Sequence, residues 1–129
     1  VSPFDVVVAC MPPAPKFAHE IKEIIDEGIL VDDGCMVVEA YGKKNGKDIL
    51  VENHVMAPGL VESFKRAGMT GEMYLTGQGG YLFSKMFING DFDMTGLISS
   101  DMLPMDKVDK FFEYAKELGI TLETKIKEL

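Results

Sequence analysis

The sequence predicts an α+β domain in which helices cover a mixed, largely antiparallel sheet. Three observations carry this prediction: two strand-like runs flank an Asn45-Gly46 dipeptide, amphipathic segments with helical spacing recur, and strands and helices do not alternate strictly. The chain has 129 residues, of which 47% are hydrophobic and 26% charged, and this is enough apolar material for one core. We therefore expect a single domain over residues 1–129.

The charge balance narrows the range of partners. Thirteen basic against twenty-one acidic residues give a net charge of −8, which disfavours binding to nucleic acid or to an anionic membrane surface. No apolar run approaches the ~18 residues that span a bilayer. Cys10 and Cys35 lie far apart in the sequence, so we expect two buried thiols in strands and a reducing, cytoplasmic setting, without a disulfide or a zinc site.

The N-terminal part of the chain predicts a strand followed by a helix. Residues 4–11 (FDVVVACM) form a β-branched apolar run bounded by prolines, which is typical of an inner strand. Residues 16–27 have apolar side chains on one helical face, including Phe17 and Ile21, and Gly28 is suited to end the helix.

The clearest pattern lies in residues 35–57, which predict a β-hairpin. An Asn-Gly pair favours a type I′ turn, because both central residues of that turn need a positive φ. A two-residue loop pairs Lys44 with Lys47 and places Glu39 opposite Glu52. One face of this hairpin is the expected core face, with Asn53 as its polar member; its apolar residues are Met36, Val38, Ala40, Ile49, Val51 and Val55.

The second half of the chain predicts three more helices and two more strands. We expect a short helix from Pro58 to Gly68, a strand over residues 71–76 and a helix over residues 77–89. A last helix follows Pro104, and a strand covers residues 120–126. The helix over residues 77–89 is apolar nearly all round, so we expect it to be buried, either centrally or against another subunit.

A glycine cluster is the first candidate for chemistry. Thr76, Gly77, Gln78 and Gly79 resemble the start of a dinucleotide fingerprint, but its third glycine is absent because position 82 is Leu82. A helix that begins at this cluster would offer free backbone N–H groups to a carboxylate or a phosphate. Close packing of the helix start against a neighbouring strand is the alternative.

A pair of carboxylates is the second candidate. Glu39 and Glu52 face each other in the predicted hairpin, and His54 lies one step along on the same face. Close carboxylates raise one pKa for acid-base work, or receive a cation such as a substrate ammonium. A solvated sheet face, or a register that differs by one residue, is the alternative.

The order of several motifs resembles the C-terminal domain of the saccharopine dehydrogenase family. The resemblance begins at residues 37–47 (VVEAYGKKNGK), a strand followed by a Gly-x-x-x-Gly hairpin, and continues from Thr76-Gly77 to Gly90. It includes residues 95–104 (TGLISSDMLP), where Ser100-Asp101 stand in place of the family's usual Pro-Glu, and residues 111–123. Together these motifs cover roughly residues 35–125.

This resemblance implies the second domain of a longer, Rossmann-type dehydrogenase, in keeping with a chain that begins without Met. Family members oxidise a secondary amine of amino-acid type in lysine metabolism, and this domain closes over the substrate cleft and builds a homodimer. An N-terminal Rossmann domain, expected outside these residues, would bind NAD or NADP and supply the catalytic residues, so the chain alone should be inactive.

Within the chain, the resemblance makes a set of residues candidates for contact with an amino-acid substrate: Glu39, Glu52, His54, Thr76, Gly77, Gln78 and Gly79. Two other functions fit the same sequence. One is a stand-alone amino-acid-binding regulatory module, and the other is a structural dimerisation domain.

Overall fold

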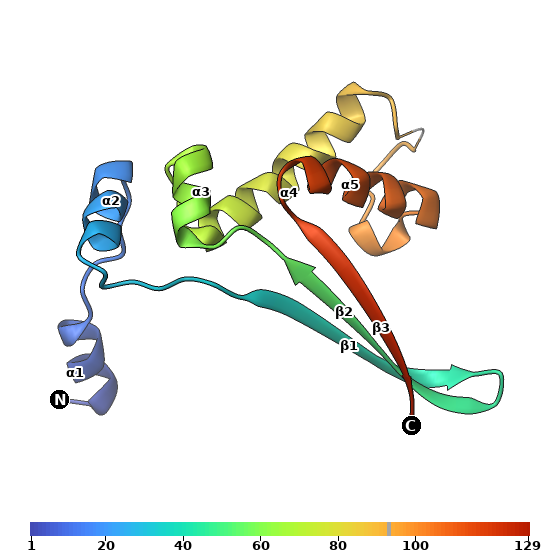
Figure 1. The fold of residues 1–129 in the computed structure, drawn as a ribbon, viewed down its shortest axis with the longest axis horizontal. Coiled ribbons are helices and arrows are strands. Elements are labelled where there is room, and N and C mark those ends of the chain that lie inside the picture. Colours follow the sequence, from blue (N-terminus) through green and yellow to red (C-terminus); the bar gives the residue numbers. More distant parts are fainter. Residues whose placement is uncertain (93) are drawn as a thin grey trace.

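The computed structural model describes residues 1–92 and 94–129 as an α+β fold with an open antiparallel sheet (Figure 1). In chain order, the elements in these ranges are α1 (Pro3–Cys10), α2 (Ala18–Asp26), β1 (Cys35–Lys44), β2 (Lys47–Met56), α3 (Leu60–Ala67), α4 (Gly71–Ile88), a 3-10 turn (Ser100–Met102), α5 (Met105–Glu117) and β3 (Thr121–Glu128). The strand order is β1-β2-β3, so β2 is central and both of its neighbours run antiparallel to it.

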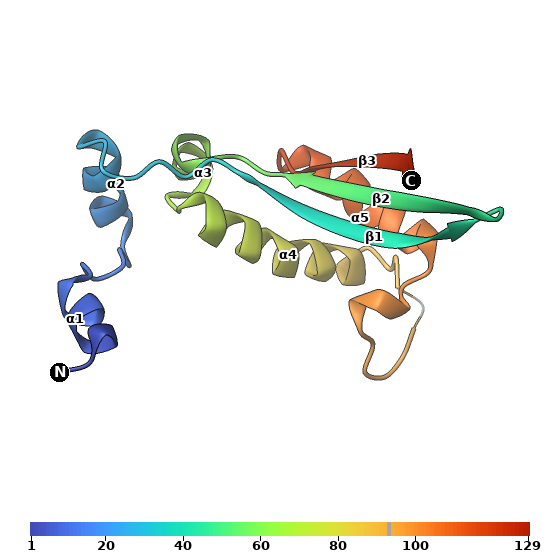
Figure 2. The same cartoon turned by 90° about the horizontal axis from the view of Figure 1, so that it is seen from below.

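The predicted hairpin is confirmed, including its register. Asn45 and Gly46 adopt φ values of 54° and 78°, the positive values that the turn requires. Lys44 pairs with Lys47, and Glu39 lies directly opposite Glu52. The tip of this hairpin projects past the helices, as two views at right angles show (Figures 1 and 2).

The core lies where α4, α5 and the start of β3 meet. Leu82 of α4, Ala115 of α5 and Ile120 are almost completely buried and form one cluster, against which Val55 of β2 packs. The Tyr74 hydroxyl of α4 donates to the carbonyl oxygen of Leu118 at 3.0 Å, which joins the two helices at one end. The helices therefore cover the sheet mainly at the end where β2 finishes and β3 starts.

The expected core face of the hairpin is covered only in part. Val55 reaches the core cluster, but Met36 and Val38 of β1 are 55% and 51% exposed. Leu50, on the opposite face, is 8% exposed and lies between Tyr41 and Lys127 in the register. The prediction was therefore wrong for the β1 half of this face, whereas Ile49, Val51 and Val55 of β2 are half-buried. The strands are longer than the helical layer that packs on them.

The strand expected over residues 4–11 is the helix α1. The Ser2 side chain accepts a hydrogen bond from the Asp5 N–H at 3.2 Å, and the Asp5 carboxylate accepts from the Ser2 N–H at 3.0 Å. This capping box, with Pro3 in the first turn, favours a helix over the strand that the valines suggest. No residue of α1 is buried, and Figures 1 and 2 show it apart from the sheet.

The strand over residues 71–76 and the helix over residues 77–89 are one continuous helix, α4. Thr70 caps it, because its side-chain oxygen accepts from the Met73 N–H at 3.3 Å, so the helix begins six residues earlier than expected. Leu82 and Met86 are buried, whereas Tyr81, Phe87 and Ile88 are 50%, 63% and 86% exposed. Burial of this apolar helix is therefore confirmed for one side only.

The remaining helices and strands agree with the sequence analysis. The predicted burial of the two cysteines does not. Helices α2, α3 and α5 and strand β3 lie within the predicted segments or extend them by one or two residues. Cys10 in α1 and Cys35 at the start of β1 are free and exposed, so the expectation of buried thiols was wrong. Neither α1 nor β1 has a buried residue.

The chain exposes more surface than a compact domain of its mass. Its accessible surface is 9339 Å², against about 6,770 Å² for a compact monomer of this size. The excess of about 2,600 Å² comes with exposed apolar side chains on α1, on the hairpin and on α4. In the described part of the chain, none of the helices combines the length and apolar character needed to cross a membrane.

Candidate functional site

The sheet brings Glu39, Glu52 and His54 together on one face. Glu39 of β1 lies opposite Glu52 of β2, and His54 follows two residues along β2. Because side chains alternate along a strand, these residues point away from the face on which Val55 meets the helical core. The predicted grouping of these three residues is therefore the observed one, on a polar face of the sheet.

A lysine of β3 neutralises one of the two carboxylates. The Lys127 ammonium donates to the Glu52 carboxylate at 2.7 Å, and the Glu52 side chain is only 13% exposed. This hydrogen bond lowers the pKa of Glu52 and raises the pKa of Lys127. The effect on Glu52 is opposite to the raised pKa expected from a carboxylate pair, because β3 supplies a cation that bonds to Glu52.

Glu39 has a different partner. The Tyr41 hydroxyl donates to the Glu39 carboxylate at 3.3 Å, and the negative charge of Glu39 raises the pKa of Tyr41. In β2, His54 lies opposite Val37 and Glu123, and its Nε2 atom is buried without a hydrogen-bond partner among the described residues. Among the described residues, His54 therefore makes no hydrogen bond to Glu39 or Glu52 through which a proton could pass.

Substituting Lys127 tests the electrostatics of this face. In Lys127→Met we expect the pKa of Glu52 to rise, because the ammonium is lost while Glu39 stays opposite. A pKa lowered by folding adds stability that is lost as the pH falls through the folded-state value, so this variant should lose less stability on acidification. Titration of the Glu52 carboxyl carbon by NMR measures the shift.

Lys125→Met is the matched control for this titration. Lys125 lies opposite Glu52 in the register, but its ammonium contacts Glu123 at 3.5 Å. We expect a smaller rise in the pKa of Glu52 than in Lys127→Met. An unchanged pKa in Lys127→Met would show that the ion pair does not form in solution.

The glycine cluster does not form a helix start. Thr76, Gly77, Gln78 and Gly79 lie in the interior of α4, where backbone N–H groups bond within the helix. Thr76 and Gly77 line a depression with Ile21 of α2, away from the carboxylate pair. The helix start expected at these residues was therefore wrong, since α4 begins at Gly71 and its free N–H groups lie there.

The Gly71 N–H is occupied by the chain itself. The Asp32 carboxylate accepts from the Gly71 N–H at 2.9 Å, and the Asp32 carbonyl oxygen accepts from the Leu60 N–H at 2.7 Å. One residue of the connection between α2 and β1 thus caps α4 and also holds the start of α3.

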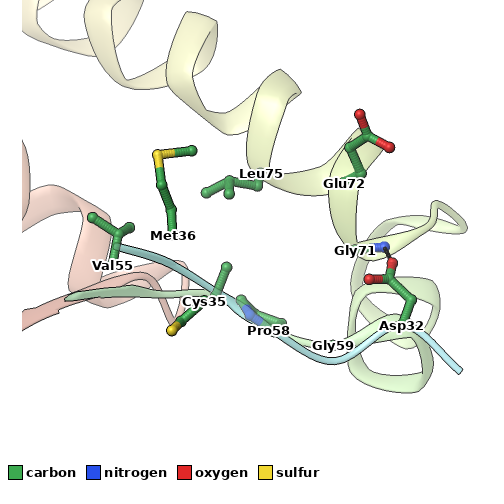
Figure 3. Close-up of a pocket in the computed structure, with 11 residues that line it drawn as sticks. Asp32, Cys35, Met36, Val55, Pro58, Gly59, Gly71, Glu72 and Leu75 are labelled. Atoms are coloured by element: carbon green, nitrogen blue, oxygen red, sulfur yellow. Dashed lines mark hydrogen bonds between the residues drawn. The ribbon is translucent and has the colours of Figure 1, made fainter. Parts of the chain in front are cut away.

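A cleft of about 390 Å³ lies beside this cap, between the start of β1, the end of β2 and the first turn of α4 (Figure 3). Met36, Val55 and Leu75 line one part of it with apolar groups, and Asp32 and Glu72 add carboxylates. Its size falls within the range of small-molecule pockets. Sequence analysis missed Asp32 and Glu72, although Asp32 follows a helix-ending glycine and Glu72 follows Gly71.

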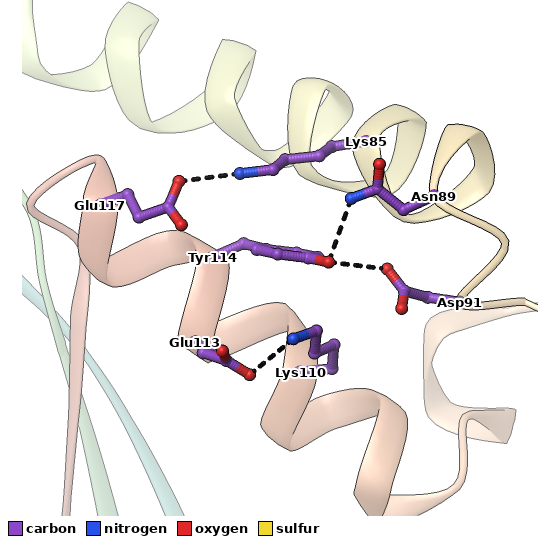
Figure 4. A network of polar contacts seen from close by, with 7 residues as sticks. All are labelled: Lys85, Asn89, Asp91, Lys110, Glu113, Tyr114 and Glu117. Atoms are coloured by element: carbon purple, nitrogen blue, oxygen red, sulfur yellow. Dashed lines mark hydrogen bonds and ion pairs between the residues drawn. The ribbon is translucent and has the colours of Figure 1, made fainter.

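A second polar cluster joins α4 to α5 (Figure 4). The Tyr114 hydroxyl donates to Asp91 at 3.0 Å and accepts from the Asn89 amide at 3.0 Å. The ammonium groups of Lys85 and Lys110 lie 4.2 Å and 4.7 Å from the centre of the Tyr114 ring. The Tyr114 ring therefore contacts two cations, and its hydroxyl both donates and accepts a hydrogen bond. Because these groups bind one another inside the protein, the cluster has a packing role.

Each of these lysines is also ion-paired. Lys85 contacts Glu117 at 2.8 Å and Lys110 contacts Glu113 at 2.9 Å, and these hydrogen bonds raise the pKa of both lysines. Both cations therefore stay charged beside the aromatic ring. Lys85 of α4 strengthens the contact with Tyr114 of α5, whereas Lys110 and Tyr114 lie within α5.

These features define the class of protein: an α+β domain whose open three-stranded sheet carries an ion-paired polar face and borders an apolar cleft with carboxylates. Within residues 1–92 and 94–129, no three His, Cys, Asp or Glu side chains gather as metal ligands. No protein-family model, no curated protein and no solved structure matches the chain.

Proposed function

We propose that this chain is the substrate-side domain of an NAD(P)-dependent oxidoreductase of the saccharopine dehydrogenase type, acting on a secondary amine of amino-acid type. The observation that carries the proposal is the cleft at the start of α4, which combines apolar walls with carboxylates and so suits a protonated amine on an aliphatic chain. The motif order over residues 35–125 supports the reaction class.

In this proposal Glu72 is the residue that meets the ammonium. Asp32 is already engaged by the Gly71 N–H, whereas the Glu72 side chain is exposed at the first turn of α4 (Figure 3). Met36 and Leu75 would then contact the aliphatic part of the substrate. The bound NAD or NADP would accept the hydride, and it would be held by a Rossmann domain outside these residues.

The large exposed surface also supports the proposal that this chain packs against another protein surface. The excess of about 2,600 Å² over a compact monomer exceeds the ~800 Å² that each partner buries in a standard interface. The same observation favours the second candidate function, a structural dimerisation domain.

Binding of an amine to the chain tests the role of the cleft. Saccharopine, the secondary amine that joins a glutamate-derived group to the lysine side chain, is added while backbone amide shifts are followed by NMR. We expect saturable shifts at residues around the cleft, including Gly71 and Val55, and an affinity at least about tenfold weaker in Glu72→Gln, since a charge-assisted contact is lost.

Glu23→Gln is the control, because it makes the same change on the exposed surface of α2. Its affinity for the amine should equal that of the unsubstituted chain. Shifts that spread without saturation, or an affinity unaffected by Glu72→Gln, would contradict an amine site in the cleft.

The oxidoreductase part is tested on the natural gene product. We expect an intact mass well above that of these 129 residues, and amine-dependent reduction of NAD or NADP by that protein but not by the chain alone. A natural product no heavier than this chain would contradict the proposal and favour the regulatory or dimerisation alternatives.

A further inference from the structure

We propose that two copies of this chain join through the outer edge of β1, antiparallel about a two-fold axis at Tyr41, to form a continuous six-stranded sheet. This inference deepens the homodimer that belongs to the proposed function and names the surface that makes it. Four features of the hairpin support it: its free backbone groups, its exposed strand β1, its charge pattern and its position beyond the helices.

The free backbone groups follow from the hairpin register. In a hairpin closed by a two-residue turn, the residues that flank the turn, here Lys44 and Lys47, form a hydrogen-bonded pair. Every second residue of β1 counted from Lys44 therefore bonds to β2. The residues between them, Val37, Glu39, Tyr41 and Lys43, direct their N–H and C=O groups to the outer edge, which no described strand covers.

Both edges of the sheet are exposed and carry charged residues, but in different patterns. Along β3 the charged residues Glu123, Lys125 and Lys127 follow one another on one face, and such charges discourage pairing with another strand. All ten residues of β1 are exposed, and Val37 and Val38 are 44% and 51% exposed. On β1 the residues directed to the outer edge include Glu39 and Lys43, whose opposite charges can pair with those of a second strand.

The charged residues of β1 favour a second copy of the chain as the partner, and they favour one pairing register. Antiparallel pairing of two β1 strands about Tyr41 places Glu39 of each copy opposite Lys43 of the other, which gives two cross-strand pairs of opposite charge. Moving the axis by two residues along the strand sets Glu39 against its own copy, or Lys43 against its own copy. Like charges directly opposite are destabilising, so the register about Tyr41 is favoured.

The position of the hairpin leaves room for this pairing. Figures 1 and 2 show the tip of β1 and β2 beyond the helices and beyond the C-terminus, so the helical layer does not stand beside the outer edge of β1 at the tip. Tyr41 itself is 68% exposed. The excess surface of about 2,600 Å² is also ample for the ~800 Å² that each partner of a stable dimer buries.

Charge reversal and its rescue test the proposal. The mass of the chain in solution is measured by light scattering and by sedimentation equilibrium over a range of concentrations. We expect a dimer for the unsubstituted chain, and a dissociation constant raised at least about tenfold by Glu39→Lys or by Lys43→Glu, because each change creates two like-charge pairs. The double variant E39K/K43E exchanges the charges and should restore the dimer.

Glu123→Lys is the control, because it reverses a charge on the other edge of the sheet and should leave the dimer unchanged. A monomeric unsubstituted chain, a dimer that neither single change weakens, or a double variant as weak as the single ones would overturn the proposal. The amine titration reports on the cleft and Glu72, whereas the mass measurement reports on the edge of β1. Failure of the proposed function can therefore be distinguished from failure of the proposed dimer.

Discussion

Leu82→Ala is expected to destabilise the chain by about 3–5 kcal/mol, a large part of the stability of a small domain. Leu82 is 1% exposed and contacts the cluster that Ala115 and Ile120 form, so its removal leaves a cavity between α4, α5 and the start of β3. Urea unfolding followed by circular dichroism measures the change in the free energy of unfolding.

Leu97→Ala is the matched control, because it makes the same chemical change at a side chain that is 102% exposed. We expect its free energy of unfolding to stay within about 0.5 kcal/mol of the unsubstituted chain. Equal effects of the two substitutions would mean that the contact between α4 and α5 is not the core of the domain.

Gly71→Ala is expected to lower the free energy of unfolding by about 1–3 kcal/mol, although alanine is the better helix former. A Cβ atom at Gly71 would lie 2.7 Å from the Asp32 carboxylate oxygen, so the carboxylate that caps α4 must move. The first N–H group of α4 then loses its partner. Thermal and urea unfolding of the variant measure this cost.

Gly77→Ala provides the opposite expectation within the same helix. A Cβ atom at Gly77 meets nothing within 4 Å, so the substitution should stabilise the chain by about 0.5–1 kcal/mol through helix propensity alone. A loss of stability at Gly77, or a gain at Gly71, would contradict the placement of the helix start at residue 71.

Local signals made the hairpin and three of the helices predictable. Asn45-Gly46 fixes both the turn and the register, because a one-residue slip would change the face of every side chain. Gly28, Gly68 and Gly119 end their helices with a positive φ, as their places in the sequence suggested. In these segments the residues that determine the conformation are neighbours in the chain.

The errors arose where distant residues or caps decide the structure. Met73 and Leu75 alternate as in a strand, but the caps from Thr70 and Asp32 start a helix at that point. The glycines at 77, 79 and 80 suggested a break, whereas the packing of Leu82 against Ala115 of α5 keeps the helix continuous. Local propensity is outweighed by tertiary contacts here.

The candidate site was predictable only within the hairpin. Glu39, Glu52 and His54 share a face, as the period of two requires, but Lys127 reaches Glu52 from a strand far along the chain. The alternating charged residues of β3 indicate a polar face, but they do not indicate which strand lies beside β3. The cleft was missed for the same reason, because Asp32, Met36 and Glu72 meet only through tertiary structure.

Helix α1 has no buried residue, so its susceptibility to proteolysis can indicate whether another surface covers it. An isolated eight-residue helix is marginal in water, and Phe4 at its start is 74% exposed. A protease that cleaves after aromatic residues should therefore cut the free chain first at this segment. If another surface covers α1, the cut slows, and the cleavage rate at Phe4 measures how much of the chain is in the assembled state.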